Sequence, residues 1–480
     1  MLKTNKYISI LVFTFLAFTS CKSLKVDIRE ENKTLPESYV SNSNAVKDTT
    51  NSAALKWRDY FTDEHLVALI DTALNNNQEL NIIRQEIEMS RNEIRAKKGE
   101  YLPRVSGYVG AGADKVSRYS RNGALEATTD IEPGKAFPEP LQDYTVGFQA
   151  NWEIDVWKKL RNAKNAAVSR YLSTIAGKNF MITQLVSEIA NDYYELLALD
   201  NQLIRVEQNI KLQTNALQIV KQQKESAKVT ELAVRRFEAH LFSTKSLKFE
   251  IEQQIIEAEN KINFLVGRFP QPVLRDADTF NDLVPNGIKQ GLSSQLLDNR
   301  MDIKRAELAL EANKLDVKVA KARFYPSFGI SAGIGLQSFN PTYLIKRPES
   351  MLFSLAGDMV APLINRAGIK AQYYSANAKQ LQAVFEYEKT ILSAYIEVTN
   401  QLSKIENIEK SYDFKAKEVD ALNRSIEISN VLFKSARADY LEILLTQQEA
   451  IDSQFELIEL KKRQLNATIN TYKALGGGWN

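Results

Sequence analysis

Two long stretches of the chain repeat apolar residues with a period of 3.5, the spacing of a coiled-coil seam. In the first stretch the series is Ile189, Leu196, Leu203, Ile210 and Leu217, with Leu199, Val206 and Val220 interleaved. In the second it is Ile391, Val398, Ile405 and Tyr412, with Tyr395 and Leu402 interleaved. No proline falls between Pro140 and Pro270 or after Pro362. Because a proline costs about 3 kcal/mol in a helix interior, both stretches predict very long helices, the first from about 158 to 226.

Outside these stretches the period changes to two, which predicts β-strands. Large apolar residues alternate with small or polar ones in residues 143–154 and 327–337, and more weakly in 105–113 and 353–361. A transmembrane β-barrel has this alternation, with apolar side chains toward lipid and polar ones toward a lumen. A soluble sheet with one wet face has it too, so the strand pattern alone leaves both readings open.

The order of predicted elements occurs twice, with an offset of about 220 residues. Each half has a helix, a short segment that ends in proline, two strands and a long helical hairpin. The first helix spans 65–100 and is followed by Tyr101-Leu102-Pro103; the second spans 301–322 and is followed by Phe324-Tyr325-Pro326. Four strands per chain cannot close a barrel, because the smallest transmembrane barrels need eight. A membrane-spanning sheet of this kind therefore requires oligomerisation: two copies supply eight strands and three supply twelve.

The first residues read as an export signal. Lys3 and Lys6 precede the apolar run Ile8–Phe18, so we expect a signal peptide over residues 1–20. Phe18-Thr19-Ser20-Cys21 then resembles a lipobox, and Cys21 is the single cysteine of the chain. We expect Cys21 to carry the lipid, palmitate included, and residues 21–55 to form a lipidated leader. One cysteine permits no intrachain disulfide.

Composition argues against several functions. The chain has 62 Lys and Arg residues and 59 Asp and Glu residues, so its net charge is too small to indicate a nucleic-acid-binding protein. His65 and His240 are the only histidines, and no phosphate-binding or nucleophile motif is present. We therefore expect no enzyme activity, no catalytic residues, no metal site and no cofactor besides the covalent lipid.

Several segments resemble the outer membrane efflux protein family, the TolC-like outer membrane factors, and their lipoprotein branch. The opening segment has Trp57, Tyr60-Phe61, Asp63 and Ala73-Leu74-Asn75-Asn76-Asn77, and a second repeat begins with Arg300, Asp302-Ile303 and Ala306. The remaining matches are residues 152–157, at a strand-to-helix junction, and Leu475-Gly476-Gly477-Gly478-Trp479 at the carboxyl end.

The resemblance implies an α+β membrane protein that acts as a homotrimer. Three chains would form a twelve-stranded β-barrel in the cell outer membrane above a helical coiled-coil tunnel in the periplasm. The channel would passively conduct substrates of an efflux or type I secretion system. Its partners would be outer-membrane lipid, a periplasmic adaptor protein and an inner-membrane pump. The two repeats would comprise residues 56–270 and 271–480, and we expect loops 114–142 and 338–350 to face out of the cell.

The resemblance also implies functional residues at the periplasmic helix turns. Ala227, Lys228 and Ala436 would contact the adaptor; the two alanines stand where a glycine is usual. Alanine adopts a positive φ only at a cost, so the sequence leaves the turn geometry open.

Just after the second turn, Glu442 would line the closed aperture around the threefold axis. Three such carboxylates repel one another and attract cations, which favours cation selectivity. Arg437 and Asp439 would tie neighbouring helices in the closed state.

One structural alternative is a periplasmic coiled-coil lipoprotein, such as an adaptor or spacer. It accounts for the long helices and the lipid, but not for four alternating strands in two repeats. Removal of residues 1–21 distinguishes the two, because an adaptor without its lipid should remain soluble without detergent.

Overall fold

The computed structural model describes residues 29–36, 39, 50–283, 287–435 and 440–479. The chain divides into two compact units. The strand unit contains residues 29–31, Tyr101–Asn162 and Asn313–Phe385. The helical unit contains the described residues of Asn32–Glu100, Ala163–Ala312 and Glu386–Asn480.

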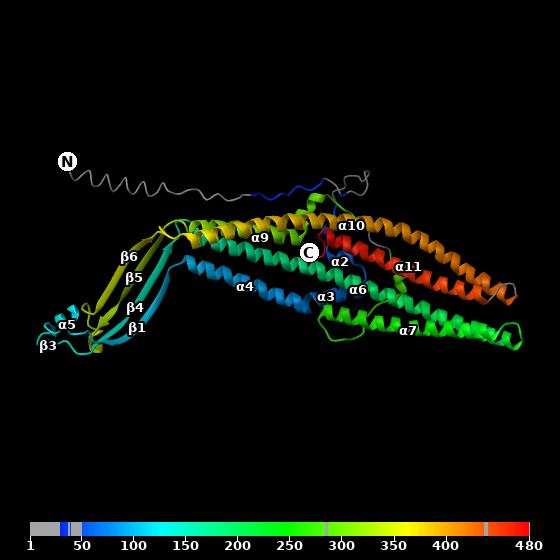
Figure 1. Ribbon diagram of the computed structural model, residues 1–480, viewed down its shortest axis with the longest axis horizontal. Helices are drawn as coiled ribbons and strands as arrows, with labels where there is room; N and C mark the ends of the chain where they lie inside the picture. Colours follow the sequence, from blue (N-terminus) through cyan, green and yellow to red (C-terminus); the bar gives the residue numbers. More distant parts are fainter. Residues whose placement is uncertain (1–28, 37–38, 40–49, 284–286, 436–439, 480) are drawn as a thin grey trace. The chain divides into compact units, whose positions relative to one another are not determined.

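The strand unit is built on one antiparallel sheet with strand order β1-β4-β5-β6 (Figure 1). Its strands are β1 (Arg104–Asp114), β4 (Leu141–Ile154), β5 (Ser327–Ser338) and β6 (Met351–Val360), which confirms all four predicted strands. The loops between them hold α5 (Arg121–Glu126), β2 (Asp130–Glu132), β3 (Lys135–Ala136) and η4 (Pro341–Tyr343). Within the described residues β1 and β6 each pair along one edge only.

The register of the sheet aligns large apolar residues in rows that cross the strands. One row contains Val109, Val146, Leu336 and Met351. The other face carries small and polar residues such as Gly333 and Ser354. Most of the large apolar side chains are exposed in a single chain, Val109 by 85% and Phe353 by 82%. The alternation of the sequence thus produces one continuous apolar face.

The long helices lie where the absence of proline predicted them. The two longest are α6 (Lys159–Glu225) and α10 (Ala367–Lys434), and both lie in the proline-free stretches. The others are α2 (Trp57–Tyr60), α3 (Glu64–Asn76), α4 (Gln78–Tyr101), α7 (Glu231–Val266), α8 (Leu296–Asn299), α9 (Met301–Ala322) and α11 (Tyr440–Ala474), with short turns η1 (Ser52–Ala54), η2 (Ala277–Asp282) and η3 (Ser293–Gln295). No helix in the described part of the chain is long and apolar enough to cross a membrane.

The continuous helix predicted over 65–100 is wrong in one respect, because the chain breaks at Asn77. This residue has ψ 128°, outside the helical region. Its side chain accepts a hydrogen bond from the Leu80 backbone N–H at 3.0 Å and donates one to the Leu265 carbonyl at 2.9 Å. A tertiary partner thus stabilises a local cap that ends one helix and starts the next.

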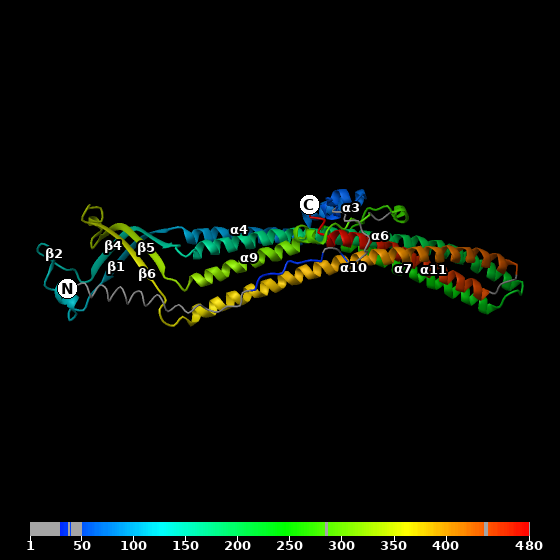
Figure 2. The same cartoon turned by 90° about the horizontal axis from the view of Figure 1, so that it is seen from above.

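In the helical unit α6, α7, α10 and α11 run alongside one another (Figures 1 and 2). Ile189, Leu196 and Val206 are fully buried, and Val398 likewise on α10, so the heptad positions form the core. Ion pairs join the helices outside the seam, for example Lys248–Glu207 at 2.8 Å between α7 and α6 and Lys462–Glu195 at 2.6 Å between α11 and α6. The heptad prediction is confirmed.

Candidate functional site

The turn between α6 and α7 is closed by a left-handed alanine. Ala227 has φ 53°. Its N–H donates to the Lys224 carbonyl at 2.9 Å, and the N–H of Lys228 donates to the Gln223 carbonyl at 2.9 Å. These two bonds are the 5→2 and 6→1 pair of a Schellman motif. The turn therefore has the geometry that usually calls for glycine, although an alanine occupies the left-handed position.

The start of α7 completes the turn. The Thr230 side chain accepts a hydrogen bond from the Ala233 N–H at 3.4 Å and caps the helix. Glu231 pairs with Lys224 and, at 2.8 Å, with Arg235. The hydrogen bond from Lys224 holds the pKa of the Glu231 carboxyl below its usual range. The Lys224–Glu231 pair connects the end of α6 to the start of α7.

Below the turn, an apolar cluster packs three helices together. Leu217 and Val220 of α6 contact Val234 and Phe237 of α7, and Ile443 of α11 joins the same cluster. Since Ile443 points into this core and is only 2% exposed, the neighbouring Glu442 points away from it. Glu442 is exposed and lies in the first turn of α11.

The structure places three of the predicted site residues. Ala227, Lys228 and Glu442 are exposed at the ends of α6 and α11. Cys21, Ala436, Arg437 and Asp439 lie outside the described residues. The roles of all seven stay predictions.

Buried polar side chains interrupt the seam, and sequence reasoning missed them. Gln213 occupies the position between Val206 and Val220 in the interleaved series, yet it is only 1% exposed. Among the described residues, the Gln213 Oε1, Gln447 Oε1 and His240 Nε2 atoms are buried without a hydrogen-bond partner. Burial lowers the pKa of His240. The sequence shows a gap in the apolar series at Gln213, but the gap does not distinguish a buried glutamine from an exposed one.

The carboxyl ends of α7 and α11 are closed by the same motif, with a glycine in the left-handed position. Gly267 has φ 76°, and a Cβ there would lie 2.5 Å from the Asn76 carbonyl oxygen. Gly476 has φ 98°, and a Cβ there would lie 2.7 Å from the Asn299 carbonyl. Each glycine thus lets the end of a helix approach the junction between two others, α3–α4 in the first case and α8–α9 in the second.

Arg300, at the second of these junctions, is a buried cation with a full set of partners. It forms ion pairs with Asp302 and Glu397, both at 2.7 Å, and donates to the Ala474 carbonyl at 2.8 Å. These contacts connect the start of α9, the middle of α10 and the end of α11. Because the cation is buried, both carboxylates and the carbonyl are needed to replace the water that it loses on folding.

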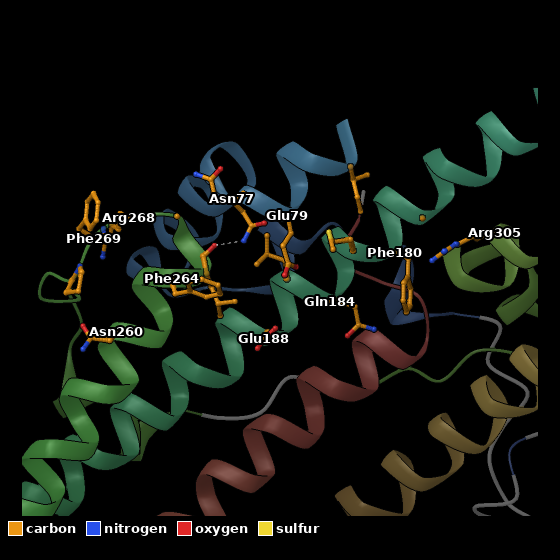
Figure 3. A pocket seen from close by; sticks show the side chains of 18 residues that line it. Asn77, Glu79, Phe180, Gln184, Glu188, Asn260, Phe264, Arg268, Phe269 and Arg305 are labelled. Atoms are coloured by element: carbon orange, nitrogen blue, oxygen red, sulfur yellow. Dashed lines mark hydrogen bonds between the residues drawn. The ribbon is translucent and has the colours of Figure 1, made fainter. Parts of the chain in front are cut away.

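A groove of about 830 Å³ lies beside the first junction, between α4, α6 and the end of α7 (Figure 3). Asn77 and Glu79 border it on one side, and Phe264 and Arg268 on another (Figure 3). Phe264 is 75% exposed. The described residues hold no group of three or more His, Cys, Asp or Glu side chains placed to bind a metal ion.

Comparisons with known proteins agree with one another. The family model described as outer membrane efflux protein matches residues 69–268 and 292–477. The chain is 25% identical over 470 residues to the probable outer membrane lipoprotein SilC of Salmonella typhimurium, and the alignment covers 98% of each chain. It is 26% identical over 467 residues to the cation efflux system protein CusC of Escherichia coli (strain K12), 96% of this chain and 97% of that one.

Solved structures show the same fold. A crystal structure of CusC superposes with a TM-score of 0.81 at 22% identity, over 94% of this chain and 99% of that one. The open state of the Neisseria gonorrhoeae MtrE outer membrane channel gives 0.82 at 22% identity, over 95% and 98%.

Proposed function

The chain belongs to the outer membrane efflux protein family and is an outer-membrane efflux channel, and we propose that three copies assemble into the conducting pore. In this trimer the sheets form a twelve-stranded barrel, and the helices form a tunnel below it. The channel receives cargo passively from an inner-membrane pump through a periplasmic adaptor. The two sequence repeats, residues 56–270 and 271–480, contribute equivalent strands and helices to the wall of the channel.

The open sheet supports assembly of several copies, and the family resemblance supports three copies over two. The outer edges of β1 and β6 present unpaired backbone N–H and C=O groups in the described chain. An unpaired strand edge inside lipid costs several kcal/mol per group. Pairing of β6 with β1 of the next copy removes both edges, and three copies close the ring.

Exposed apolar stripes on the helices support the same assembly. On α7, Phe242, Phe249 and Ile256 recur every seven residues and are 63%, 69% and 51% exposed. On α10, Phe414 and Ile428 are 73% and 59% exposed. Heptad stripes of this kind match the seams between coiled-coil helices. We propose that neighbouring copies cover them.

Native mass spectrometry in detergent tests the trimer, with three copies expected. Phe249→Glu places a charge in the stripe and should shift the protein towards monomer. Gln254→Glu adds the same charge at another exposed position of α7 and should remain trimeric. A wild-type monomer that nevertheless gives stable conductance steps in planar bilayers would refute the assembly.

The exposed turn at Ala227 and Lys228 is proposed as the adaptor contact, with Ala436 in the second turn. A photoreactive amino acid at Lys228 should crosslink to the adaptor in cells. The same group at Lys245 serves as the matched control, because Lys245 is exposed on α7 about four helical turns from the start of that helix. Equal crosslinking at both positions would contradict a contact confined to the turn.

We propose that the pump, and not this channel, selects the cargo. Relatives of nearly equal similarity are named for cation efflux, for pyoverdine export in Pseudomonas aeruginosa and for solvent efflux in Pseudomonas putida. Co-purification of the full-length chain with its inner-membrane pump identifies the system. If this channel restored export equally well beside pumps of different cargo, the proposal would be supported; restoration of one cargo with every pump would oppose it.

A further inference from the structure

The turns that join the sheet to the helices of the strand unit surround a cavity of about 260 Å³. Its walls come from the β4–α6 turn (Trp157), the α9–β5 turn (Tyr325) and the β6–α10 turn (Pro362). None of the expected functional residues lies here. We call this region the junction site.

Two aromatic side chains form one wall of the junction site. The rings of Trp157 and Tyr325 stack at 4.7 Å, and the Trp157 Nε1–H donates to the Pro326 carbonyl at 2.7 Å. The side chains are nevertheless 43% and 40% exposed. Trp and Tyr with one apolar and one wet side are enriched where a membrane meets water.

The β6–α10 turn presents two apolar side chains to the outside. Leu363 is 77% exposed and Ile364 is 91% exposed. The turn has a defined shape, because Asn365 adopts φ 54° and the Arg366 Nε–H donates to the Pro362 carbonyl at 2.8 Å. The two apolar residues lie three and four positions after Val360, the last residue of β6.

All four junctions between sheet and helices carry cations. The segments 101–104, 153–161, 321–327 and 361–370 contain two acidic residues. Glu153 lines the cavity and forms an ion pair with Lys159. The other acidic residue is Asp155. That carboxylate accepts the backbone N–H groups of Leu160 and Arg161 and pairs with the Arg161 side chain at 3.2 Å. The basic residues of these segments are Arg104, Lys158, Lys159, Arg161, Lys321, Arg323, Arg366 and Lys370.

We infer that the junction site binds the phosphate headgroup of a phospholipid in the membrane leaflet nearest the helices. Arg323 and Arg366 attract the phosphate, because guanidinium groups pair well with its oxygens. Leu363 and Ile364 insert among the acyl chains, and Trp157 with Tyr325 marks the boundary with water. The inference rests on the proposed membrane-spanning sheet; it adds a specific lipid contact at one end of that sheet.

The charge and the apolar surface together favour a phospholipid over other occupants. A free phosphate ion would use the cations and leave Leu363 and Ile364 in water. A neighbouring copy of the chain would cover the apolar pair and leave the cation excess without a partner. A phospholipid satisfies both features at once.

The test uses full-length trimers in detergent, titrated with short-chain phosphatidylglycerol and followed by native mass spectrometry. Because each basic residue near an anionic lipid contributes about fivefold in affinity, Arg323→Gln with Arg366→Gln should weaken binding about 20- to 30-fold. Leu363→Ser with Ile364→Ser should also weaken it. The control, Lys115→Gln with Arg121→Gln, removes two cations at the opposite end of the strands and should bind as wild type.

Three outcomes would overturn the inference. One is unchanged lipid binding by the arginine variant. Another is displacement of the lipid by equimolar inorganic phosphate, which would identify an anion site. The third is a crosslink from Ile364→Cys to a neighbouring subunit with no labelling by a photoreactive lipid. Conductance in planar bilayers distinguishes failure of the lipid inference from failure of the proposed function. If the variants conduct and still bind lipid, only the lipid inference fails. If the wild-type protein forms no pores, the proposed function is refuted.

Discussion

Replacement of Ala227 by glycine should stabilise the α6–α7 turn. The alanine holds φ 53° inside a Schellman motif. An L-residue in the left-handed region costs about 1–2 kcal/mol, and glycine removes that cost. Glycine also raises the entropy of the open chain, which offsets about 0.4–1 kcal/mol. The expected net gain is therefore about 1 kcal/mol in the free energy of local opening.

Hydrogen exchange at the Lys228 amide measures this gain directly. That N–H donates to the Gln223 carbonyl at 2.9 Å, and the bond exists only while the turn is closed. When closing is faster than exchange, the rate reports the local opening equilibrium. Since 1.4 kcal/mol corresponds to a factor of ten, Ala227→Gly should slow exchange about fivefold.

A glycine introduced inside the helix should have the opposite effect and lower the free energy of local opening. Gln218 is exposed in α6 with helical neighbours on both sides, so Gln218→Gly should cost about 1 kcal/mol and accelerate exchange nearby. Ala227→Val should also accelerate exchange, because a β-branched side chain tolerates the left-handed region less well than alanine. Unchanged or faster exchange in Ala227→Gly would refute a left-handed Ala227.

Three further substitutions and one measurement on the unaltered protein test other parts of the molecule. Gly476→Ala should destabilise the folded chain by about 2–4 kcal/mol, because φ 98° and a Cβ at 2.7 Å from a backbone carbonyl both oppose it; a melting temperature equal to wild type would contradict the close approach. Glu442→Gln should reduce cation selectivity and block by multivalent cations in planar bilayers, whereas Glu250→Gln on α7 should not; equal selectivity in both would remove Glu442 from the aperture. Burial lowers the pKa of His240, so the unfolded chain binds more protons and stability should fall as the pH drops below about 6.5; His240→Asn should flatten this dependence in urea unfolding, and an unaltered slope would refute it. Mass spectrometry of the membrane fraction should show an acylated Cys21, and an unmodified thiol would disprove the anchor.

The sequence by itself determined the regular elements of this chain. Heptads and the absence of proline predicted α6 nearly to its ends and a long helix after Pro362, and alternation predicted the four strands, two of them from a weaker pattern. These patterns are local, because a helix or strand buries one side whatever its partner is. The family resemblance likewise depended on short segments and their order.

Part of the candidate site was also within reach of sequence reasoning. Counting along α11 placed Glu442 near the turn, and the burial of Ile443 then decided that its side chain points away from the core. The gap in the apolar series at Gln213 predicted nothing by itself, since an exposed glutamine would leave the same gap. Its burial is a property of the tertiary packing, which the sequence pattern does not contain.

Only the tertiary structure decided where distant segments meet. Asn77 breaks a helical pattern because its amide reaches Leu265, 188 residues away. Ala227 accepts a left-handed conformation because the cluster around Phe237 and Ile443 packs α7 and α11 together just below the turn. Local propensity contributes about 1 kcal/mol per residue, and the burial of a few large side chains contributes more than that. Long-range packing therefore determined the conformation at the positions where it opposed local preference.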